Sequence, residues 1–203
     1  MADITFREEE VVVGAKKANK DLGNVLVGGK HLLSTKEGKG ILETYEKAEL
    51  INKDHLTGLY NRRGFDEQLR LMHAHARRMG ENLSIAFLDA DKFKNINTKY
   101  GRLKGDEVLK SIAVSMRESF RASDILARWG GDEFVAIMLF SKDVEIIKDD
   151  ELSLRINKNL QDHTPFGVDR SDVSVTVGVM SWDKTSSLYD FQKQVQDRMD
   201  SRK

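Results

Sequence analysis

The stretch ILARWGGDEFVAIML, residues 125–139, constrains the fold of this chain more than any other. Two apolar runs flank a pair of glycines, Gly130 and Gly131. This pattern predicts two antiparallel strands joined by a tight turn, because glycine adopts the positive φ that short hairpin turns need. Such a turn does not require acids, yet Asp132 and Glu133 follow directly. The hairpin therefore predicts an antiparallel sheet and marks two carboxylates that folding alone does not explain.

Apolar patterns around the hairpin extend the prediction to a whole domain. The runs LSIAFLDAD (83–91) and DVSVTVGVM (172–180) are typical of strands, the second because it alternates valines on one face. Apolar residues recur at helical spacing in four segments, 65–79 (ending before Gly80), 109–120, 152–160 and 188–199. The resulting order, β-α-β-β-α-β with helices at both ends, predicts an α+β fold. It is the split βαβ arrangement, an antiparallel-centred sheet with flanking helices.

The first 39 residues follow no clear pattern and mix short apolar runs with helix formers. From residue 41 the run ILETYEKAELINKD is typical of a helix that leads into the main domain. We therefore predict an N-terminal regulatory or linker segment of unclear fold at residues 1–45 and one domain at residues 46–203.

Composition excludes several classes of protein. Lys and Arg together balance Asp and Glu, 33 of each, so no net charge attracts nucleic acid or an acidic membrane. The absence of cysteine excludes disulfides and thiolate metal sites. The start, MADITFREEE, lacks the pattern of a signal peptide, and no apolar run approaches the ~18 residues of a membrane span. We expect a cytoplasmic protein with no membrane span that does not bind nucleic acid.

Acids at two strand ends suggest a metal site. In the predicted topology the strand ending at Asp89 lies beside the hairpin, so Asp89 and Asp132 converge. Two close carboxylates repel unless a cation lies between them, and Mg²⁺ or Mn²⁺ accepts such oxygen ligands. Paired metals of this kind stabilise the attacking and leaving oxygens in phosphoryl or nucleotidyl transfer. A single acid near a turn is more often solvated or a helix cap, but two acidic pairs in this arrangement favour the metal site.

The segment after Asp91 adds features that suit a nucleotide. Backbone amides there would open a short anion-binding turn that holds phosphates. Asn97 offers an amide and Asp106 a carboxylate, a combination that matches the hydrogen-bonding edge of guanine. The alternative stays open for both: Asn97 as a helix-end residue, and Asp106 as the N-cap of the following helix.

Four segments resemble the GGDEF family of diguanylate cyclases at the family's spacing. They are DHLTGLYNRRGF (54–65), LDADKFKNINTKYGRLKGDEVL (88–109), RWGGDEF (128–134) and VSVTVGVM (173–180). The resemblance covers about residues 46–203. It implies a cyclase- or palm-like fold and the condensation of two GTP molecules into cyclic di-GMP with release of two pyrophosphates. It also implies two Mg²⁺ (or Mn²⁺) ions per active site and a homodimer in which each subunit holds one GTP.

The resemblance also implies roles for individual residues. Asp89, Asp132 and the carbonyl of Ala90 would bind the metals, and Glu133 would help to deprotonate the attacking 3′-hydroxyl. Whether Asp132 or Glu133 is the general base stays open. Asn97 and Asp106 would recognise guanine. The other GTP-binding positions are Lys92, Phe93, Lys94, Gly130, Gly131 and Lys203.

A second site is implied by RASD, Arg121 to Asp124, which ends just before the hairpin where the family has its inhibitory RxxD motif. Arginine pairs with guanine in two parallel hydrogen bonds, and Arg155 would add a second arginine for the bound product. The alternative is a helix-end arginine paired with a nearby acid. Two other functions stay open for the chain as a whole. One is a catalytically silent module that binds GTP or cyclic di-GMP, and the other is a nucleotidyltransferase with another substrate.

Overall fold

The computed structural model describes residues 26–27, 30–31, 51–144 and 146–200. The chain divides into two units, Met1–Ile51 and Asn52–Lys203. In the first unit, β1 (Leu26–Val27) pairs antiparallel with β2 (Lys30–His31). Most of the helix predicted at residues 41–54 lies outside the described residues.

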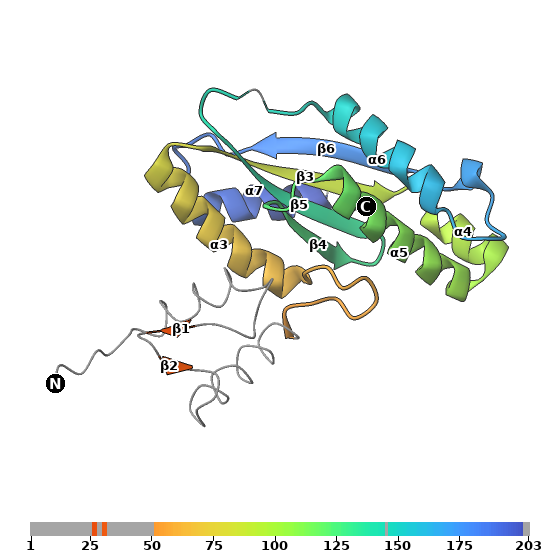
Figure 1. Ribbon diagram of the computed structural model, residues 1–203. Coiled ribbons are helices and arrows are strands. Elements are labelled where there is room, and N and C mark those ends of the chain that lie inside the picture. Colours follow the sequence, from red (N-terminus) through yellow and green to blue (C-terminus); the bar gives the residue numbers. More distant parts are fainter. Residues whose placement is uncertain (1–25, 28–29, 32–50, 145, 201–203) are drawn as a thin grey trace. The chain divides into compact units, whose positions relative to one another are not determined.

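The second unit is built on a four-stranded sheet (Figure 1). Its strands lie in the order β4 (Ile125–Gly130), β5 (Glu133–Phe140), β3 (Asn82–Ala90) and β6 (Val175–Ser181). Every neighbouring pair is antiparallel. The predicted hairpin is therefore confirmed, and so is its place beside the strand that ends in acids. The α+β fold class is confirmed with it.

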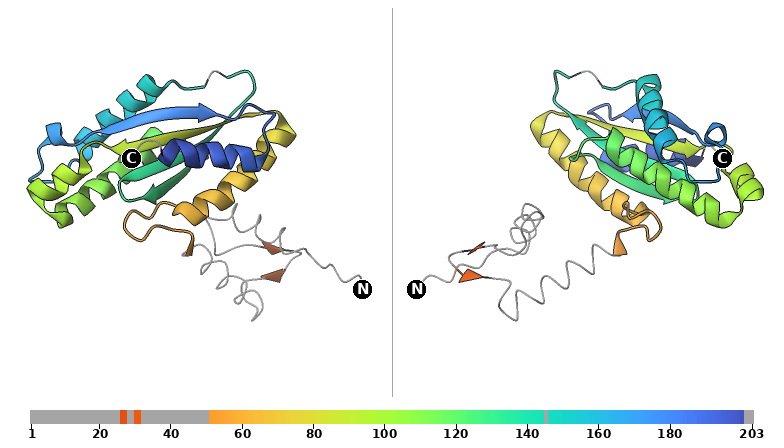
Figure 2. Two further views of the ribbon diagram at one scale, coloured as in Figure 1. Left: turned by 180° about the vertical axis from the view of Figure 1, so that it is seen from behind. Right: turned by 45° about the vertical axis from the view of Figure 1, so that its right-hand side comes forward.

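Helices cover both faces of the sheet (Figures 1 and 2). One face carries α4 (Phe93–Tyr100), α5 (Arg102–Ser119) and α6 (Asp149–His163), and a short 3₁₀ turn, η2 (Arg170–Asp172), follows α6. The other face carries α3 (Arg62–Met79) and α7 (Leu188–Asp200). The two helices inside the split βαβ unit, α5 and α6, thus share a face, and the helices at the two ends of the domain cover the opposite one.

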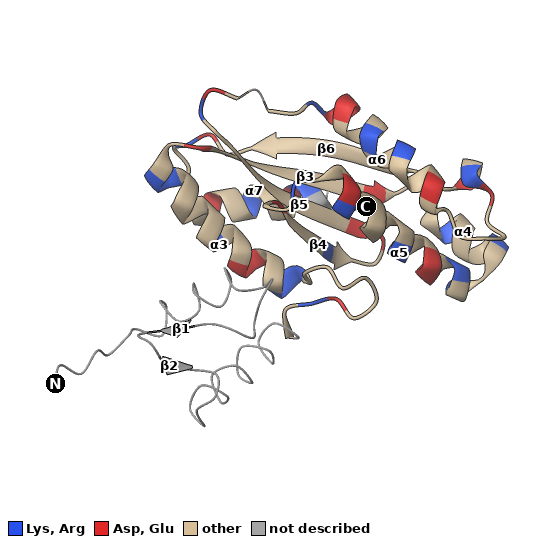
Figure 3. Ribbon diagram, viewed as in Figure 1, with Lys and Arg blue, Asp and Glu red and all other residues tan. Residues whose placement is uncertain are grey.

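Because both faces are covered, the strands are apolar on both sides. Along β3, alternate side chains enter the two separate cores, with Leu83, Ile85 and Phe87 in one and Ala86, Leu88 and Ala90 in the other. Charged residues lie mainly on helices and loops (Figure 3). Within the four described strands of this sheet the only acids are Asp89 and Glu133. Negative charge within these strands is therefore confined to the end where β3 finishes and β5 begins.

Side chains and a loop occupy both edges of the sheet. On the outer edge of β6, the Asn157 amide accepts from the Val175 N–H at 2.8 Å and donates to the Val175 carbonyl at 2.9 Å. The Asp149 carboxylate accepts from the Val179 N–H at 3.0 Å. On the edge of β4, the N–H of Tyr60 donates to Leu126 at 3.0 Å. These bonds satisfy backbone groups that would otherwise be available to another strand.

Local signals explain where α3 begins and ends. Asn61 caps its N-terminus by accepting from the Gly64 N–H at 3.0 Å. Gly80 ends it in the left-handed conformation, at φ 70°, as its sequence position predicted. Among the helices that the structure describes, none combines the length and the hydropathy needed to cross a bilayer.

Candidate active site

The acids predicted to converge lie at one end of the sheet. Asp89 is directly opposite Glu133 in the β3–β5 ladder. The N–H of Ala90 donates to the carbonyl of Asp132 at 3.1 Å. The structure therefore brings Asp89, Ala90, Asp132 and Glu133 together, and Glu133 is only 8% exposed. The β3–β5 register fixes this cluster, because a shift of one residue would turn each side chain to the other face.

The glycine turn between β4 and β5 is held by Arg128. Gly131 has φ 51°, which glycine adopts without strain. The guanidinium of Arg128 donates to the Gly131 carbonyl through Nε at 2.9 Å and Nη2 at 2.6 Å. Its Nη1 lies 3.3 Å from the Asp54 carboxylate. Arg128 thus links the turn to the loop that precedes α3.

Asp54 is the fixed end of this link. It accepts from the N–H and the hydroxyl of Thr57 at 2.9 and 2.6 Å. Burial would raise the pKa of Asp54, but the two bonds from Thr57 and the positive charge of Arg128 outweigh it, so the pKa lies below its usual value. The carboxylate therefore stays ionised and holds Arg128 in place.

A strained residue precedes the predicted phosphate-binding amides. Lys92, the N-cap of α4, has φ 52° and ψ 31°, a left-handed conformation that costs a lysine about 1 kcal/mol. The first hydrogen bond of the helix runs from the Asn95 N–H to the Lys92 carbonyl at 2.7 Å. The amides of Phe93 and Lys94 precede that bond, at the positive end of the helix dipole. An anion is favoured in this position.

Gly105 on α5 lies directly against the side chain of Asn97 on α4. A Cβ built on Gly105 would lie 2.0 Å from Oδ1 of Asn97, so the amide of Asn97 occupies the space left by the missing side chain. Asp106 is the next residue along α5. The N-cap of α5 is Gly101, so the alternative that Asp106 caps this helix is wrong. Asn97 lies inside α4, and its carbonyl accepts from the Gly101 N–H at 3.0 Å.

A polar cavity of about 510 Å³ separates α4 from the segment before β6. The second acid of DAD, Asp91, accepts there from the hydroxyls of Ser174 and Thr176 at 2.5 and 2.7 Å. On the same side, Asp172 accepts from Lys99 and from the Tyr100 hydroxyl, both at 2.6 Å. These bonds lower the pKa of Asp172 and raise that of Lys99. Sequence reasoning gave none of these residues a role, because their partners are distant in the chain.

The oxygen atoms in this cluster suit a hard divalent cation whose coordination shell is completed by oxygen atoms of the substrate. Among the residues that the structure describes, no three acidic or histidine side chains form a metal-binding group. Asp89, Asp132 and the Ala90 carbonyl would provide an incomplete shell of oxygen atoms. Mg²⁺ is commonly held in this way, by one or two carboxylates plus substrate phosphates.

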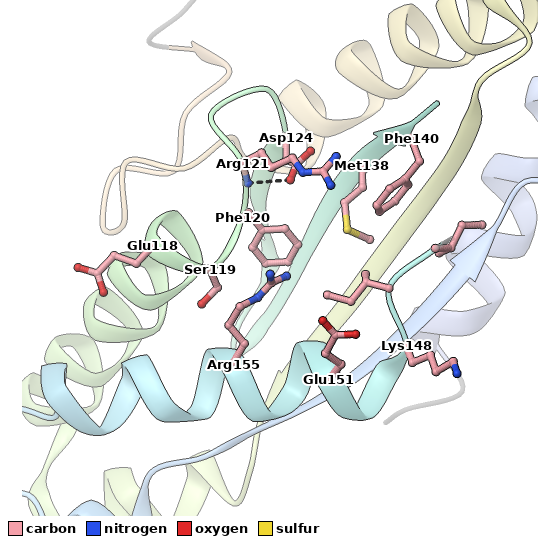
Figure 4. A pocket seen from close by; sticks show the side chains of 12 residues that line it. Glu118, Ser119, Phe120, Arg121, Asp124, Met138, Phe140, Lys148, Glu151 and Arg155 are labelled. Carbon is pink, nitrogen blue, oxygen red and sulfur yellow. Dashed lines mark hydrogen bonds between the residues drawn. The ribbon is translucent and has the colours of Figure 1, made fainter. Parts of the chain in front are cut away.

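The three residues predicted for the inhibitory site line one cavity of about 520 Å³ (Figure 4). It lies at the other end of the hairpin, between the end of α5, strand β5 and α6. Arg121 and Asp124 close a turn: the Arg121 N–H donates to the Asp124 carboxylate at 2.8 Å, and the Asp124 N–H to the Arg121 carbonyl at 2.9 Å. The Arg121 guanidinium carbon lies 5.2 Å from the centroid of the Phe140 ring. Arg155 extends into the cavity from α6.

Electrostatics connect these three residues. Burial raises the pKa of Asp124, and the Arg121 N–H with the charges of Arg121 and Arg155 opposes that rise. The Asp124 carboxylate bonds the backbone of Arg121, while the guanidinium lies against an aromatic ring. That geometry differs from the simple helix-end ion pair of the alternative interpretation.

Lys203, predicted to contact phosphates, lies outside the described residues. Sequence reasoning also missed Asp54 and Arg128 as the residues that hold the glycine turn. Both fall in the segments DHLTGLYNRRGF and RWGGDEF. The motifs contained the signal, but only the fold shows which residues meet.

Comparisons with known proteins agree with this geometry. The family described as "Diguanylate cyclase, GGDEF domain" matches residues 51–203. Diguanylate cyclase DgcP of Pseudomonas aeruginosa is 47% identical over 85 residues, 42% of this chain and 13% of DgcP. Response regulator PleD of Caulobacter vibrioides is 36% identical over 138 residues, 64% of this chain and 29% of PleD. The match thus spans less than a third of either relative.

A solved structure has the same fold. It is the GGDEF domain of DgcB from Caulobacter crescentus in complex with cyclic di-GMP, with a TM-score of 0.58 and 23% sequence identity. The likeness covers 72% of this chain and 86% of that one. Because the family match extends over well more than half of the residues, this chain belongs to the GGDEF domain family of diguanylate cyclases.

Proposed function

We propose that this chain is a diguanylate cyclase that condenses two GTP molecules into cyclic di-GMP and two pyrophosphates. The observation that carries the proposal is the pairing of β3 with β5. It places Asp89 opposite Glu133 and bonds the Ala90 N–H to the Asp132 carbonyl at 3.1 Å. Two strand ends that are distant in sequence thus supply one set of oxygen ligands beside a glycine turn.

Each residue of the cluster has a distinct part in the proposal. Asp89, Asp132 and the Ala90 carbonyl hold two Mg²⁺ or Mn²⁺ ions, which neutralise charge on the phosphates and on the attacking and leaving oxygens. Glu133, buried beside them, assists removal of the proton from the attacking 3′-hydroxyl. Gly130 and Gly131 leave room for the nucleotide to approach the backbone.

Substrate binding uses α4 and the first turns of α5. The amides of Phe93 and Lys94, with Lys92, bind the triphosphate. Asn97 and Asp106 bind the guanine edge, and the missing side chain of Gly105 supports this role because it leaves space for the Asn97 amide. Lys203 adds a contact to phosphate.

Regulation and assembly complete the proposal. Two subunits, each with one GTP, meet as a homodimer, because each active site needs a second substrate. Cyclic di-GMP binds back at Arg121, Asp124 and Arg155 and inhibits synthesis. Residues 1–45 regulate this assembly ahead of a catalytic domain at 46–203, and the protein acts in the cytoplasm.

The test is incubation of the purified chain with GTP and Mg²⁺, followed by chromatography of the nucleotides. We expect cyclic di-GMP and pyrophosphate, and no product from the Asp132→Ala variant or after chelation of the metal. Asp143→Ala, which removes an exposed acid on a loop after β5, is the matched control and should retain activity. Product formation by Asp132→Ala at the wild-type rate would refute the site assignment.

A silent effector module is the second candidate. The cavity lined by Arg121, Asp124 and Arg155 favours it, because a domain could bind cyclic di-GMP there without synthesising it. Calorimetric binding of cyclic di-GMP by a chain that forms no product would select this alternative. Turnover that reaches a plateau early, and that Arg121→Ala prolongs, would select the inhibited enzyme.

A further inference from the structure

Arg62 lies where three parts of the domain meet. It is the first residue of α3, directly after the capping residue Asn61. Its guanidinium carbon lies 4.6 Å from the centroid of the Trp129 ring on β4. Its Nη2 donates a hydrogen bond to Oε1 of Gln196 on α7. One exposed side chain therefore joins the start of α3 to a central hairpin and to the last helix.

Trp129 is two residues before Gly131, and it falls at an irregularity of the β4–β5 ladder. The register between β4 and β5 shifts between Arg128 and Gly130, so within these two described strands Trp129 has no residue directly opposite. Bulges of this kind bend a strand and redirect a side chain. The Trp129 ring is held by side chains. It packs edge-on against Phe65, with centroids 5.3 Å apart at 80°, and lies under Arg62.

The position of Arg62 on its helix is electrostatically unfavourable. The first turn of a helix carries the positive end of the dipole, which disfavours a cation. No acidic residue lies in the first turn of α3, and the acid that feels the charge of Arg62 is Asp66, one turn further along the helix. The contacts with Trp129 and Gln196 add to that compensation, since tryptophan is the best aromatic partner for a cation. These contacts distinguish Arg62 from a solvated arginine at a helix start.

We propose that Arg62 is a positioning residue for the turn that carries Asp132. This inference rests on the proposed function. Arg128 holds the carbonyl of Gly131, and Arg62 holds the ring of Trp129, so the turn is fixed on both sides of Gly130. Through Gln196 the same side chain fixes α7 relative to the turn. Arg62 does not touch the substrate, and its effect reaches the reaction through the position of Asp132.

The experiment compares three variants in the full chain. Arg62→Met keeps an apolar side chain and removes the guanidinium. Arg62→Lys keeps the positive charge but not the planar guanidinium group. Arg63→Met, at the exposed neighbouring position, is the control for loss of one positive charge at the start of α3. The readouts are kcat, the KM for GTP, the thermal midpoint and tryptophan emission, to which only Trp129 and Trp182 contribute.

We expect Arg62→Met to lower kcat by about fivefold and to change the KM by less than about twofold. A displaced turn moves Asp132 while the guanine contacts on α4 and α5 remain. Tryptophan emission should shift to longer wavelength, because Trp129 becomes more exposed to water without the Arg62 guanidinium. Arg62→Lys should recover part of kcat, because an ammonium can still cover the ring. Arg63→Met should match the wild type in kcat and emission.

Two results would overturn the proposal. One is equal kcat and emission in Arg62→Met and Arg63→Met. The other is a lower thermal midpoint with unchanged kcat per folded molecule, which a purely structural role would give.

If the wild type forms no product, the proposed function fails separately. Arg62 is then judged by the change in emission on titration with GTP and Mg²⁺. A change that is absent in Arg62→Met but intact in Arg63→Met supports its role, and equal changes in both refute it.

Discussion

The β4–β5 hairpin carries two candidate sites of different chemistry at its two ends. Its turn presents Asp132 and Glu133, which suit cations. Its open end lies beside Arg121 and Arg155, which suit an anionic ligand. Asp124 immediately precedes β4, and Phe140 is the last residue of β5 (Figures 1 and 4).

The two ends are built in different ways. Near the turn, the backbone sets the geometry. The β3–β5 register aligns the strand ends, and Lys92 is left-handed at the start of α4. Arg128 donates to the carbonyl of Gly131. At the open end, side chains from the end of α5, from β5 and from α6 make the cavity. Backbone geometry tolerates little adjustment, whereas side chains adopt new rotamers. The turn should therefore respond sharply to small changes, and the open end gradually.

The largest expected effect separates the two ends. Asp89→Asn removes one negative charge from the cluster and should lower turnover by about 10³-fold. It should leave the affinity for cyclic di-GMP within about twofold, because independent distant sites behave additively. Initial rates and calorimetry measure the two quantities.

Arg121→Ala provides the reverse case, with turnover preserved and affinity for cyclic di-GMP lost. If Asp89→Asn also abolished binding of cyclic di-GMP, the two ends would not be independent.

Gly105→Ala tests how sharply the nucleotide end responds. The new Cβ would lie 2.0 Å from Oδ1 of Asn97, so the amide must move. A site built to hydrogen-bond its substrate loses much affinity when one partner is displaced, and we expect the KM for GTP to rise about tenfold. Steady-state kinetics with GTP give the value. Lys110→Ala, at an exposed position on the same helix, is the control and should have a wild-type KM.

Gly64→Ala tests the loop that supports the turn. A Cβ there would lie 2.4 Å from the backbone carbonyl of Asn52, which cannot rotate away as a side chain does. We expect a loss of about 2 kcal/mol in the free energy of unfolding. Turnover should fall by a larger factor than the affinity for cyclic di-GMP. Chemical denaturation measures the first quantity.

Gly80→Ala is a useful comparison for that change. Gly80 is left-handed, but a methyl group there would meet no described atom within 4 Å. The expected cost is about 1 kcal/mol, from backbone strain alone. An equal loss in both variants would contradict the predicted clash at Gly64.

The smallest effect concerns pH and should act on both ends alike. His73 is buried against Trp182, with ring centroids 4.5 Å apart, and its Nε2 has no hydrogen-bond partner among the described residues. Burial and the nearby charge of Arg77 lower its pKa, although a backbone bond at Ser186 opposes this. The unfolded chain therefore binds a proton that the folded chain resists.

The direction follows from that difference. Stability is fully present above the unfolded pKa of about 6.5 and falls as the pH drops below it, by at most about 1.4 kcal/mol per pH unit for one proton. Thermal midpoints measured between pH 7 and pH 5 should fall more steeply in the wild type than in His73→Leu. Parallel curves would remove His73 as the cause.

Much of the fold was predictable because its signals are local. The valine alternation of β6, the helical spacing of α3 and the glycine turn each occupy a few consecutive residues. The convergence of Asp89 with the hairpin followed from topology. Helix α4 was not predicted, because its eight residues carry too weak a periodic pattern to stand out.

The contacts that hold the site in place were less predictable, because they join residues that are far apart in the sequence. The Arg128–Asp54 pair joins residues 74 positions apart, and the contact of Arg62 with Gln196 spans 134. Nothing in the local sequence marks such pairs. Gly105 was readable only as part of a motif, since its importance is the space it leaves for Asn97.

The bonds from α6 to the outer edge of β6 have a consequence for aggregation. Asn157 and Asp149 occupy backbone groups of Val175 and Val179, so a strand from another molecule cannot extend the sheet there while α6 stays docked. The same helix carries Arg155. A ligand that bridges Arg155 to the hairpin would also slow the detachment of α6, and would thereby protect the chain against strand-mediated fibre growth.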